Sequence, residues 1–260
     1  MCLIIFSWKS SGPYKLILAA NRDESFNRDT LGANCWIENR AIYGGRDVEK
    51  NGSWLAIKRD GRWAAITNVK QSSPTNNKEY FRSRGLLVRD YLMGNLDPQK
   101  FNKQIKSSKN FYQGYNLLMG DQENIYYKSN RKNIFVKLRK GVLGLSNDTL
   151  NCPWPKVVTG RALLRKIISK KPNNLEEHIF QMMYCKETYP NASTSNVGFK
   201  DSLKEKLSSR FVQTGTEYGT RSMSLITISY DNHVTFQERI FGKNSEEIER
   251  SIKKFQILNS

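Results

Sequence analysis

The second residue of the chain is a cysteine, and its place beside Met1 can give it two chemical groups instead of one. Initiator methionine is usually trimmed when the next residue is small, and removal of Met1 would leave Cys2 with a free α-amine. An α-amine titrates at about 8 and a thiol at about 8.5, so both are available near neutral pH. The amine can accept the thiol proton and pass it to a leaving group. The alternative is that Cys2 is a small hydrophobic residue at the start of a buried strand.

Four polar residues follow the second apolar run of the chain, in the stretch Ala20-Asn21-Arg22-Asp23-Glu24. The apolar, β-prone runs 2–7 and 14–20 are separated by a turn rich in Ser, Gly and Pro, and they predict an opening hairpin. In such a hairpin the polar stretch lies beside Cys2. Because each buried charge needs a partner, this end of the hairpin is the candidate functional site.

A series of short motifs runs in order along the chain: Met1-Cys2, Asn21-Arg22-Asp23-Glu24, Gly44-Gly45-Arg46-Asp47, Gly52-Ser53-Trp54-Leu55, Thr67-Asn68, Tyr115-Asn116-Leu117-Leu118, Gly144-Leu145-Ser146-Asn147 and Tyr218-Gly219-Thr220-Arg221-Ser222. Together they resemble the NRDE family, which is the family of the animal transport and Golgi organisation protein. The resemblance covers nearly the whole chain, and the ordered series is more specific than any one motif. More faintly, the chain resembles the cysteine N-terminal-nucleophile hydrolases that include penicillin V acylase and bile-salt hydrolase.

The resemblance implies a set of catalytic residues: Cys2, Asp23, Asn68, Asn147 and Arg221. In the hydrolase branch an Asp in an Asn-x-Asp context holds the α-amine, and Asn21-Arg22-Asp23 matches that context. The branch also carries two asparagines near the reacting carbonyl, which Asn68 and Asn147 match. A side-chain amide aimed at a developing oxyanion contributes about 3 kcal/mol.

The resemblance also implies a set of residues that bind the substrate: Asn21, Arg22, Glu24 and Arg210. The hydrolases carry an arginine just before the Asn-x-Asp segment, where this chain has Ala20, and Arg22 lies two positions on, on the same strand face. Arg210 matches a later Ser-Arg-Phe-Val context, while the NRDE pattern favours Arg221. An arginine beside Cys2 should lower the pKa of the thiol. The alternative for each arginine is a surface ion pair of about 0–1 kcal/mol.

The bulk composition indicates one folded domain. The chain has 260 residues, 38% of them hydrophobic, with no linker rich in Pro, Gly or Ser, so residues 1–260 are interpreted as a single domain. No apolar run approaches the roughly 20 residues of a membrane helix. The spacing of the four cysteines and two histidines favours neither a disulfide framework nor a metal site. The expected location is the reducing cytoplasm.

Net charge is the strongest compositional signal, at +18 from 42 Lys and Arg against 24 Asp and Glu. Such a charge attracts nucleic acids, anionic lipids or acidic small molecules. The basic residues are scattered and no nucleic-acid-binding motif appears, so nucleic acid is a disfavoured partner. A small anionic or amphipathic molecule is the expected partner, and the sequence specifies no oligomeric state.

Hydrophobic periodicity predicts both helices and strands. Apolar residues recur at three- and four-residue spacing, typical of amphipathic helices, in segments 83–94, 155–170, 174–185 and 245–257. A hairpin through Asp60-Gly61 joins strands 53–57 and 63–67. Further strands are predicted at 115–120, 124–128, 134–138, 223–230 and 234–240. This order predicts an α+β fold of antiparallel sheets covered by helices, and the resemblance implies a four-layer αββα sandwich.

Three weaker signals have ordinary explanations. The segment Gly44–Asp47 lacks the Gly-Lys-Ser/Thr ending of a phosphate loop, so it predicts a tight turn. The dipeptide Cys152-Pro153 is discussed in haem-responsive proteins, yet it equally suits a stiff entry to the helix at 155–170. Solvated or capping roles are favoured over haem ligation for His178 and His233.

Two functions stay open. In the first, Cys2 attacks the carbonyl of a small non-peptide amide or thioester, without a cofactor. In the second, the protein is a carrier or chaperone for haem or a fatty acyl-CoA, as the family's trafficking links imply. Whether Met1 is removed distinguishes the two functions, because a retained methionine leaves Cys2 without a free α-amine.

Overall fold

The computed structural model describes residues 2–10, 12–69, 82–106, 111–190 and 201–258. Met1 lies outside the described residues. The chain divides into two compact units, the first formed by Met1–Asn27 with Arg139–Gln256 and the second by Arg28–Leu138 with Ile257–Ser260. The interpretation of residues 1–260 as one domain stays a prediction.

The first unit is built on a sheet in which every neighbouring pair is antiparallel, in the order β10-β1-β2-β11-β12-β13. Its described strands are β1 (Cys2–Trp8), β2 (Tyr14–Ser25), β10 (Gly141–Leu145), β11 (Tyr218–Ser229), β12 (His233–Phe241) and β13 (Glu247–Gln256). The two longest strands, β2 and β11, pair along nearly their whole length. They form the middle of this sheet.

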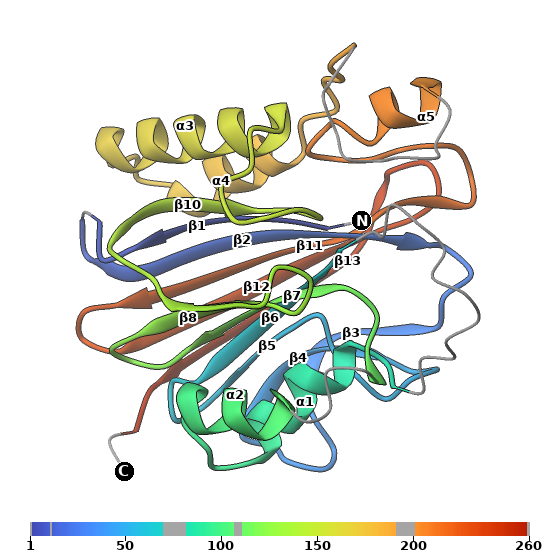
Figure 1. Cartoon of the computed structure of the whole chain (residues 1–260). Coiled ribbons are helices and arrows are strands. Elements are labelled where there is room, and N and C mark those ends of the chain that lie inside the picture. The colour runs from blue at the N-terminus through green and yellow to red at the C-terminus, as the bar shows by residue number, and fades with distance from the viewer. Residues whose placement is uncertain (1, 11, 70–81, 107–110, 191–200, 259–260) are drawn as a thin grey trace. The chain divides into compact units, whose positions relative to one another are not determined.

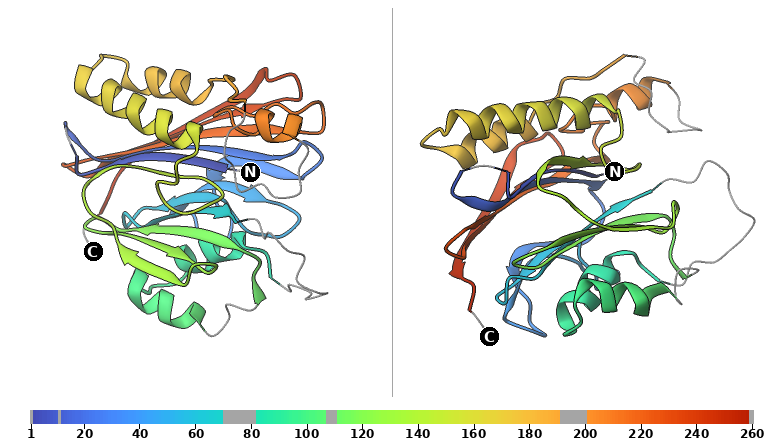
Figure 2. Two further views of the ribbon diagram at one scale, coloured as in Figure 1. Left: turned by 45° about the horizontal axis from the view of Figure 1, so that its top comes forward. Right: turned by 60° about the vertical axis from the view of Figure 1, so that its left-hand side comes forward.

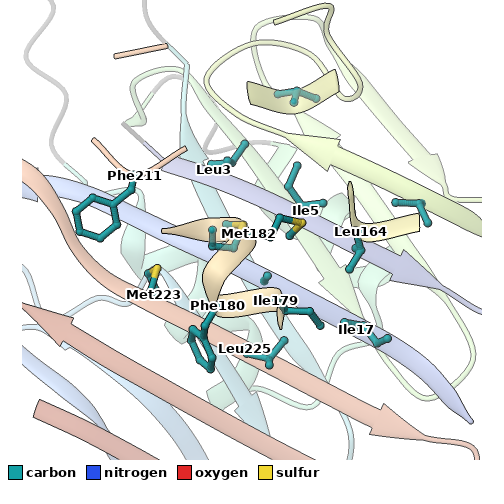
Figure 3. Packing of buried hydrophobic residues seen from close by; sticks show 14 of the residues in the cluster. Leu3, Ile5, Ile17, Leu164, Ile179, Phe180, Met182, Phe211, Met223 and Leu225 are labelled. Atoms are coloured by element: carbon teal, nitrogen blue, oxygen red, sulfur yellow. The ribbon is translucent and has the colours of Figure 1, made fainter. Parts of the chain in front are cut away.

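Two helices cover one face of this sheet: α3 (Pro155–Lys170) packs on β1 and β10, and α4 (Leu175–Met183) packs on β2 and β11 (Figure 1). A short helix, α5 (Asp201–Lys206), follows. Alternate residues of the strands face the helices, because side chains alternate along a strand. Leu3, Ile5 and Ile17 from the strands therefore meet Ile179 and Met182 of α4 in one buried cluster (Figure 3).

The second unit repeats this plan with a different sheet, in the order β3-β4-β5-β6-β7-β8-β9. Helices α1 (Gly85–Met93) and α2 (Pro98–Lys106) cover one face of it (Figure 2). They contribute buried apolar residues such as Leu87 and Phe101. The strands are β3 (Thr30–Cys35), β4 (Ile42–Asp47), β5 (Leu55–Lys58), β6 (Trp63–Asn68), β7 (Tyr115–Gly120), β8 (Ile125–Ser129) and β9 (Ile134–Lys137). The predicted α+β class with two antiparallel sheets is confirmed.

Two local predictions are wrong. Residues 245–257 were expected to form a helix, but Glu247–Gln256 is strand β13, because pairing with β12 outweighs a helical pattern of Ile and charged residues. Gly44–Asp47 lies within strand β4 instead of a tight turn. Its glycines serve close approach, since a Cβ on Gly44 would overlap Ala56 and one on Gly45 would overlap the Trp54 ring.

Within the described part of the chain, no helix is both long enough and apolar enough to cross a membrane. Cys2, Cys35, Cys152 and Cys185 are all free thiols.

Candidate functional site

Cys2 is the first residue of β1, which lies between β10 and β2 in the sheet. In the pairing of β1 with β2, Cys2 lies directly opposite Arg22. On the other side, Ile4 pairs with Leu145, so continuing that register two residues brings Asn147 opposite Cys2. Cys2 is half-buried, flanked by polar residues on both sides.

Ser146 and Asn147 hold the start of β1 from the end of β10. The main-chain N–H of Cys2 donates to Asn147 Oδ1 at 3.3 Å. The hydroxyl of Ser146 donates to the Cys2 carbonyl oxygen at 2.8 Å. Asn147 and Ser146 are both buried, so little water competes for these bonds. The main chain of Cys2 is therefore positioned by side chains as well as by the sheet ladder.

Asp23 reaches the site from β2. Its main-chain N–H donates a hydrogen bond to the Cys2 sulfur, while its carboxylate Oδ1 accepts one from Thr220 Oγ1 at 2.7 Å. Thr220 pairs with Asp23 across the strands, and Ser222 pairs with Arg22. Arg221 is therefore the extra residue of a β-bulge, a device that re-aims side chains near functional sites. The bulge lies at the level of Cys2.

Arg22 is the predicted arginine that the structure sets opposite Cys2. It is 6% exposed, and its guanidinium lies 3.8 Å from the carboxylate of half-buried Glu24. The side chains of the other two arginines contact other groups. Arg221 donates to the carbonyl of Ser25 at 3.2 Å and stacks 5.8 Å from the Phe26 ring.

Asn21 and Arg210, both predicted to bind substrate, make main-chain contacts that join strands to helices. The amide of Asn21 donates to the carbonyls of Met183 and Arg210 at 3.0 and 2.8 Å. Buried Arg210 donates to the Met182 carbonyl at 2.8 Å and to Thr159 Oγ1 at 2.7 Å. Both side chains stabilise the layer between the sheet and the helices α3 and α4.

Asn68 belongs to the second unit. It ends β6, pairs in register with Tyr115 and is half-buried. Its approach to Cys2 stays a prediction.

The pKa of the Cys2 thiol is raised and not lowered, although Arg22 acts on it in the expected direction. Burial raises the pKa of the thiol, and the negative charge of Asp23 raises it further, while the charge of the chain's α-amine, Arg22 and the Asp23 N–H lower it. The pKa of Asp23 is itself raised, chiefly by burial and against the charge of Lys156. A neutral thiol in such a site needs a base to remove its proton as it attacks.

A family model described as Transport and Golgi organisation 2 matches residues 1–243. The chain belongs to this family. It is 30% identical over 278 residues to the Mus musculus Transport and Golgi organization 2 homolog, and 28% identical over 277 residues to the Bos taurus protein, with 99% of each chain covered in both cases. It is 26% identical over 272 residues to the Drosophila melanogaster protein, covering 92% of this chain and 91% of that one.

Solved structures similar to this member of the Transport and Golgi organisation 2 family are more distant. A Caenorhabditis elegans ortholog of N-acylethanolamine-hydrolyzing acid amidase is 12% identical, with a TM-score of 0.48 over 86% of this chain and 92% of that one. The C2A mutant of conjugated bile acid hydrolase from Clostridium perfringens is 11% identical, with a TM-score of 0.43 over 98% and 97% of the two chains.

Lys156 is the site residue that the sequence analysis missed. It is 1% exposed, and its ammonium donates to the Leu207 carbonyl at 2.9 Å. Burial lowers the pKa of its ammonium, while the charges of Asp23 and Cys2 raise it. A signal was present, because Lys156 shares the four-residue spacing of the buried α3 residues Gly160, Leu164 and Ile168. Lysine is rarely buried without a partner, so a lysine within an apolar helix face indicates a functional or paired group.

The residues considered for haem have other surroundings in this Transport and Golgi organisation 2 family member. Cys152 is 3% exposed within the hydrophobic cluster, and burial raises its pKa to about 11. His178 Nδ1 lies 3.1 Å from the Asn174 carbonyl, and exposed His233 contacts Asp231 at 2.9 Å. Cys152 does not fit a haem ligand, because iron would need a thiolate presented to a pocket.

Proposed function

We propose that the protein is a cysteine N-terminal-nucleophile hydrolase that cleaves an amide or thioester of a small amphipathic anion. One observation carries the proposal: the main-chain nitrogen of Cys2 donates to the side chain of Asn147. In an ordinary strand pair this N–H would donate to a main-chain carbonyl. Once Met1 is removed, the same nitrogen is the α-amine, and it already has a buried acceptor that fixes its position beside the thiol.

In the proposed first step, the Cys2 sulfur bonds to the substrate carbonyl carbon and its proton passes to the α-amine. The raised pKa of the thiol supports this order of events, because such a thiol is nucleophilic only as its proton leaves. The amine then gives the proton to the leaving group as the carbonyl's bond to nitrogen or sulfur breaks. Water, deprotonated by the same amine, hydrolyses the Cys2 thioester and releases the acid.

The remaining groups take charge-stabilising roles. The amide N–H2 of Asn147 is the donor assigned to the oxyanion, since the amide oxygen faces the Cys2 nitrogen. Arg22, opposite Cys2, supplies the positive charge that an anionic substrate group needs. The net charge of +18 supports an anionic substrate by attracting it.

The test begins with intact mass, which fixes whether Met1 is present. Met1-free protein is then incubated with N-acyl amino acids and acyl-CoA thioesters, and both product release and acyl adducts are measured. We expect an acyl adduct on Cys2, and we expect Cys2→Ala to remove hydrolysis by about a thousandfold or more. Cys35→Ala in the second unit is the matched control and should keep wild-type rates. Met1-free protein with neither adduct nor hydrolysis would overturn the proposal and favour a carrier of acyl-CoA.

A further inference from the structure

Asp23 and Lys156 are two oppositely charged groups buried on the same side of the first sheet. Asp23 follows Ile17, Ala19 and Asn21 along the helix-facing side of β2, and it is 3% exposed. Lys156 comes from the first turn of α3, which packs on β1. An isolated buried charge is costly, whereas two opposite ones compensate each other. Their coexistence in one layer therefore needs a reason beyond packing.

The connection from β10 to α3 carries both Asn147 and Lys156 to the start of β1. Asn151 secures this connection, because its side chain accepts from the Gly144 N–H at 2.9 Å and its own N–H donates to the Gly144 carbonyl at 2.7 Å. Asn147 reaches the Cys2 nitrogen from one end of the connection. Lys156 approaches Asp23 from the other end. Both residues are therefore delivered to the same site by one short segment.

Asp23 links Lys156 to the nucleophile. Its main chain donates to the Cys2 sulfur, and its side chain lies on the helix side, where Lys156 is buried. A carboxylate this close to a thiol opposes formation of the thiolate and also raises the proton affinity of a nearby amine. A buried cation that interacts with both the carboxylate and the thiol counteracts both effects.

We propose that Lys156 is a positioning residue that neutralises the charge of Asp23 and thereby keeps the Cys2 thiol reactive near neutral pH. The inference rests on the proposed function, because it concerns the same thiol. Lys156 touches no reacting atom in this role. Its charge offsets that of Asp23 at the thiol, and its hydrogen bond to the Leu207 carbonyl holds the ammonium in place.

Other charged groups near the site also affect the titration of the Cys2 thiol. Arg22 and Glu24 come from β2, and Arg22 favours the thiolate. Cys152 and Asp148 come from the connection between β10 and α3. From β11, Thr220 and Ser222 contribute uncharged hydroxyls. None of these groups is altered in the variants below, so differences between variants report on Lys156 and Asp23 themselves.

The experiment measures the rate of Cys2 alkylation by iodoacetamide against pH, with the modified peptide quantified by mass spectrometry. Cys152 does not compete below about pH 9, because its pKa is about 11. Lys156→Gln removes the charge and retains an N–H donor for Leu207. We expect its alkylation profile to move about half a pH unit or more to higher pH, with roughly threefold slower labelling at pH 7. Lys156→Met is the second variant in case glutamine disturbs folding.

Two further variants test whether Asp23 and Lys156 have opposite effects on the thiol. Asp23→Asn should move the profile to lower pH, because the lysine charge is then unopposed. The double variant, Asp23→Asn with Lys156→Gln, should lie near wild type. Lys166→Gln, at an exposed position of the same helix, removes one charge elsewhere and should leave the profile in place.

An unshifted profile in folded Lys156→Gln and Lys156→Met would overturn the inference and leave Lys156 a structural residue. The titration uses no substrate and is read in protein with or without Met1. A shifted profile in a protein without hydrolase activity would therefore uphold the role of Lys156 while the proposed function fails. An active enzyme with an unshifted profile would uphold the proposed function and exclude the role of Lys156.

Discussion

The two units solve the same packing problem with different side chains. In the first unit, the layer between the sheet and helices α3 and α4 buries the charged groups of Asp23, Lys156 and Arg210 beside its hydrophobic cluster. In the second unit, the layer beneath α1 and α2 is a cluster of apolar and aromatic residues whose polar groups include the hydroxyls of Tyr91 and Tyr115. Lys128, which is 7% exposed, lies on the same sheet face as its partner Leu117 and is a charged residue on that side. Both layers exclude water, but the first buries Asp23 and Lys156, whose charges act on the Cys2 thiol.

This difference indicates that the charges serve something other than stability. Replacing a buried ion pair by apolar residues of similar size is often neutral or stabilising, so such a pair is weak evidence for a structural role. The second unit demonstrates that this chain can build a helix-covered sheet with a hydrophobic layer. We infer that Asp23 and Lys156 are retained for the chemistry at the start of β1, whereas Arg210 joins the sheet to its helices.

The largest effect that can test this comparison is the loss of Arg210. Arg210→Met removes the buried donors to the Met182 carbonyl and Thr159 Oγ1, which then lack those partners. We expect the free energy of unfolding in urea to fall by about 3 kcal/mol. Arg250→Met is the control, because half-exposed Arg250 pairs with Glu247 at the surface and should change stability by less than about 0.5 kcal/mol. Equal losses in the two variants would contradict the charged layer's importance.

Much of the second unit could be predicted from its sequence because its signals are local. Strand β7 matches the predicted 115–120, and the hairpin of β5 and β6 turns at Gly61, whose φ of 87° suits the Asp-Gly signal. Strand β4 was missed because two glycines usually mark a turn. Here they permit close approach of Ala56 and Trp54, which is a tertiary requirement that no local pattern reveals.

The site was only partly accessible from sequence. Cys2, Arg22 and Asp23 are brought together by one hairpin, so local pairing predicts their proximity. Asn147 could be assigned only through the family resemblance, because it comes from the end of β10, 145 residues away. Lys156 was overlooked since a lysine within an amphipathic helix normally faces solvent. Its burial depends on how α3 packs, which is set by the whole unit.

A smaller effect distinguishes the two units by how the stability of an Asp→Asn variant, relative to wild type, changes with pH. The folded-state pKa of Asp23 is raised, mainly by burial. Between its unfolded value of about 3.9 and that raised value, the folded state holds a proton that the unfolded state has lost, so wild-type stability falls as pH rises. Asparagine cannot ionise. The stability of Asp23→Asn relative to wild type should therefore improve as pH increases from 3 to 7, measured by urea unfolding at each pH.

Asp97 in the second unit provides the opposite sign as a control. It is exposed and precedes α2, and a hydrogen bond from the Lys100 main-chain N–H lowers its pKa. Ionised Asp97 stabilises the folded state at pH values above the pKa that Asp97 has in the unfolded chain. This stabilisation is lost as the pH falls through the lower pKa of Asp97 in the folded state. Asp97→Asn should therefore lose stability relative to wild type as pH rises. The same sign in both variants would show that the burial of Asp23 carries no charge penalty.

The smallest expected effect concerns the stability contributed by a buried hydroxyl group in the second unit. Tyr115 is fully buried beneath the helices, and among the described residues its hydroxyl has no hydrogen-bond partner. Tyr115→Phe removes an oxygen whose desolvation is uncompensated and keeps the edge contact with Tyr112 at 6.0 Å. We expect stability to rise or to change by less than about 0.5 kcal/mol in urea unfolding.

Tyr127→Phe is the matched substitution on the same sheet, because the buried Tyr127 hydroxyl donates to Asn116 Oδ1 at 2.9 Å. Its loss leaves a buried amide oxygen without that donor and should cost about 1–2 kcal/mol. If Tyr115→Phe were as destabilising as Tyr127→Phe, the layer beneath α1 and α2 would depend on its polar groups as the charged layer of the first unit does. The contrast between the two units would then lie only in the kind of polar group that each one buries.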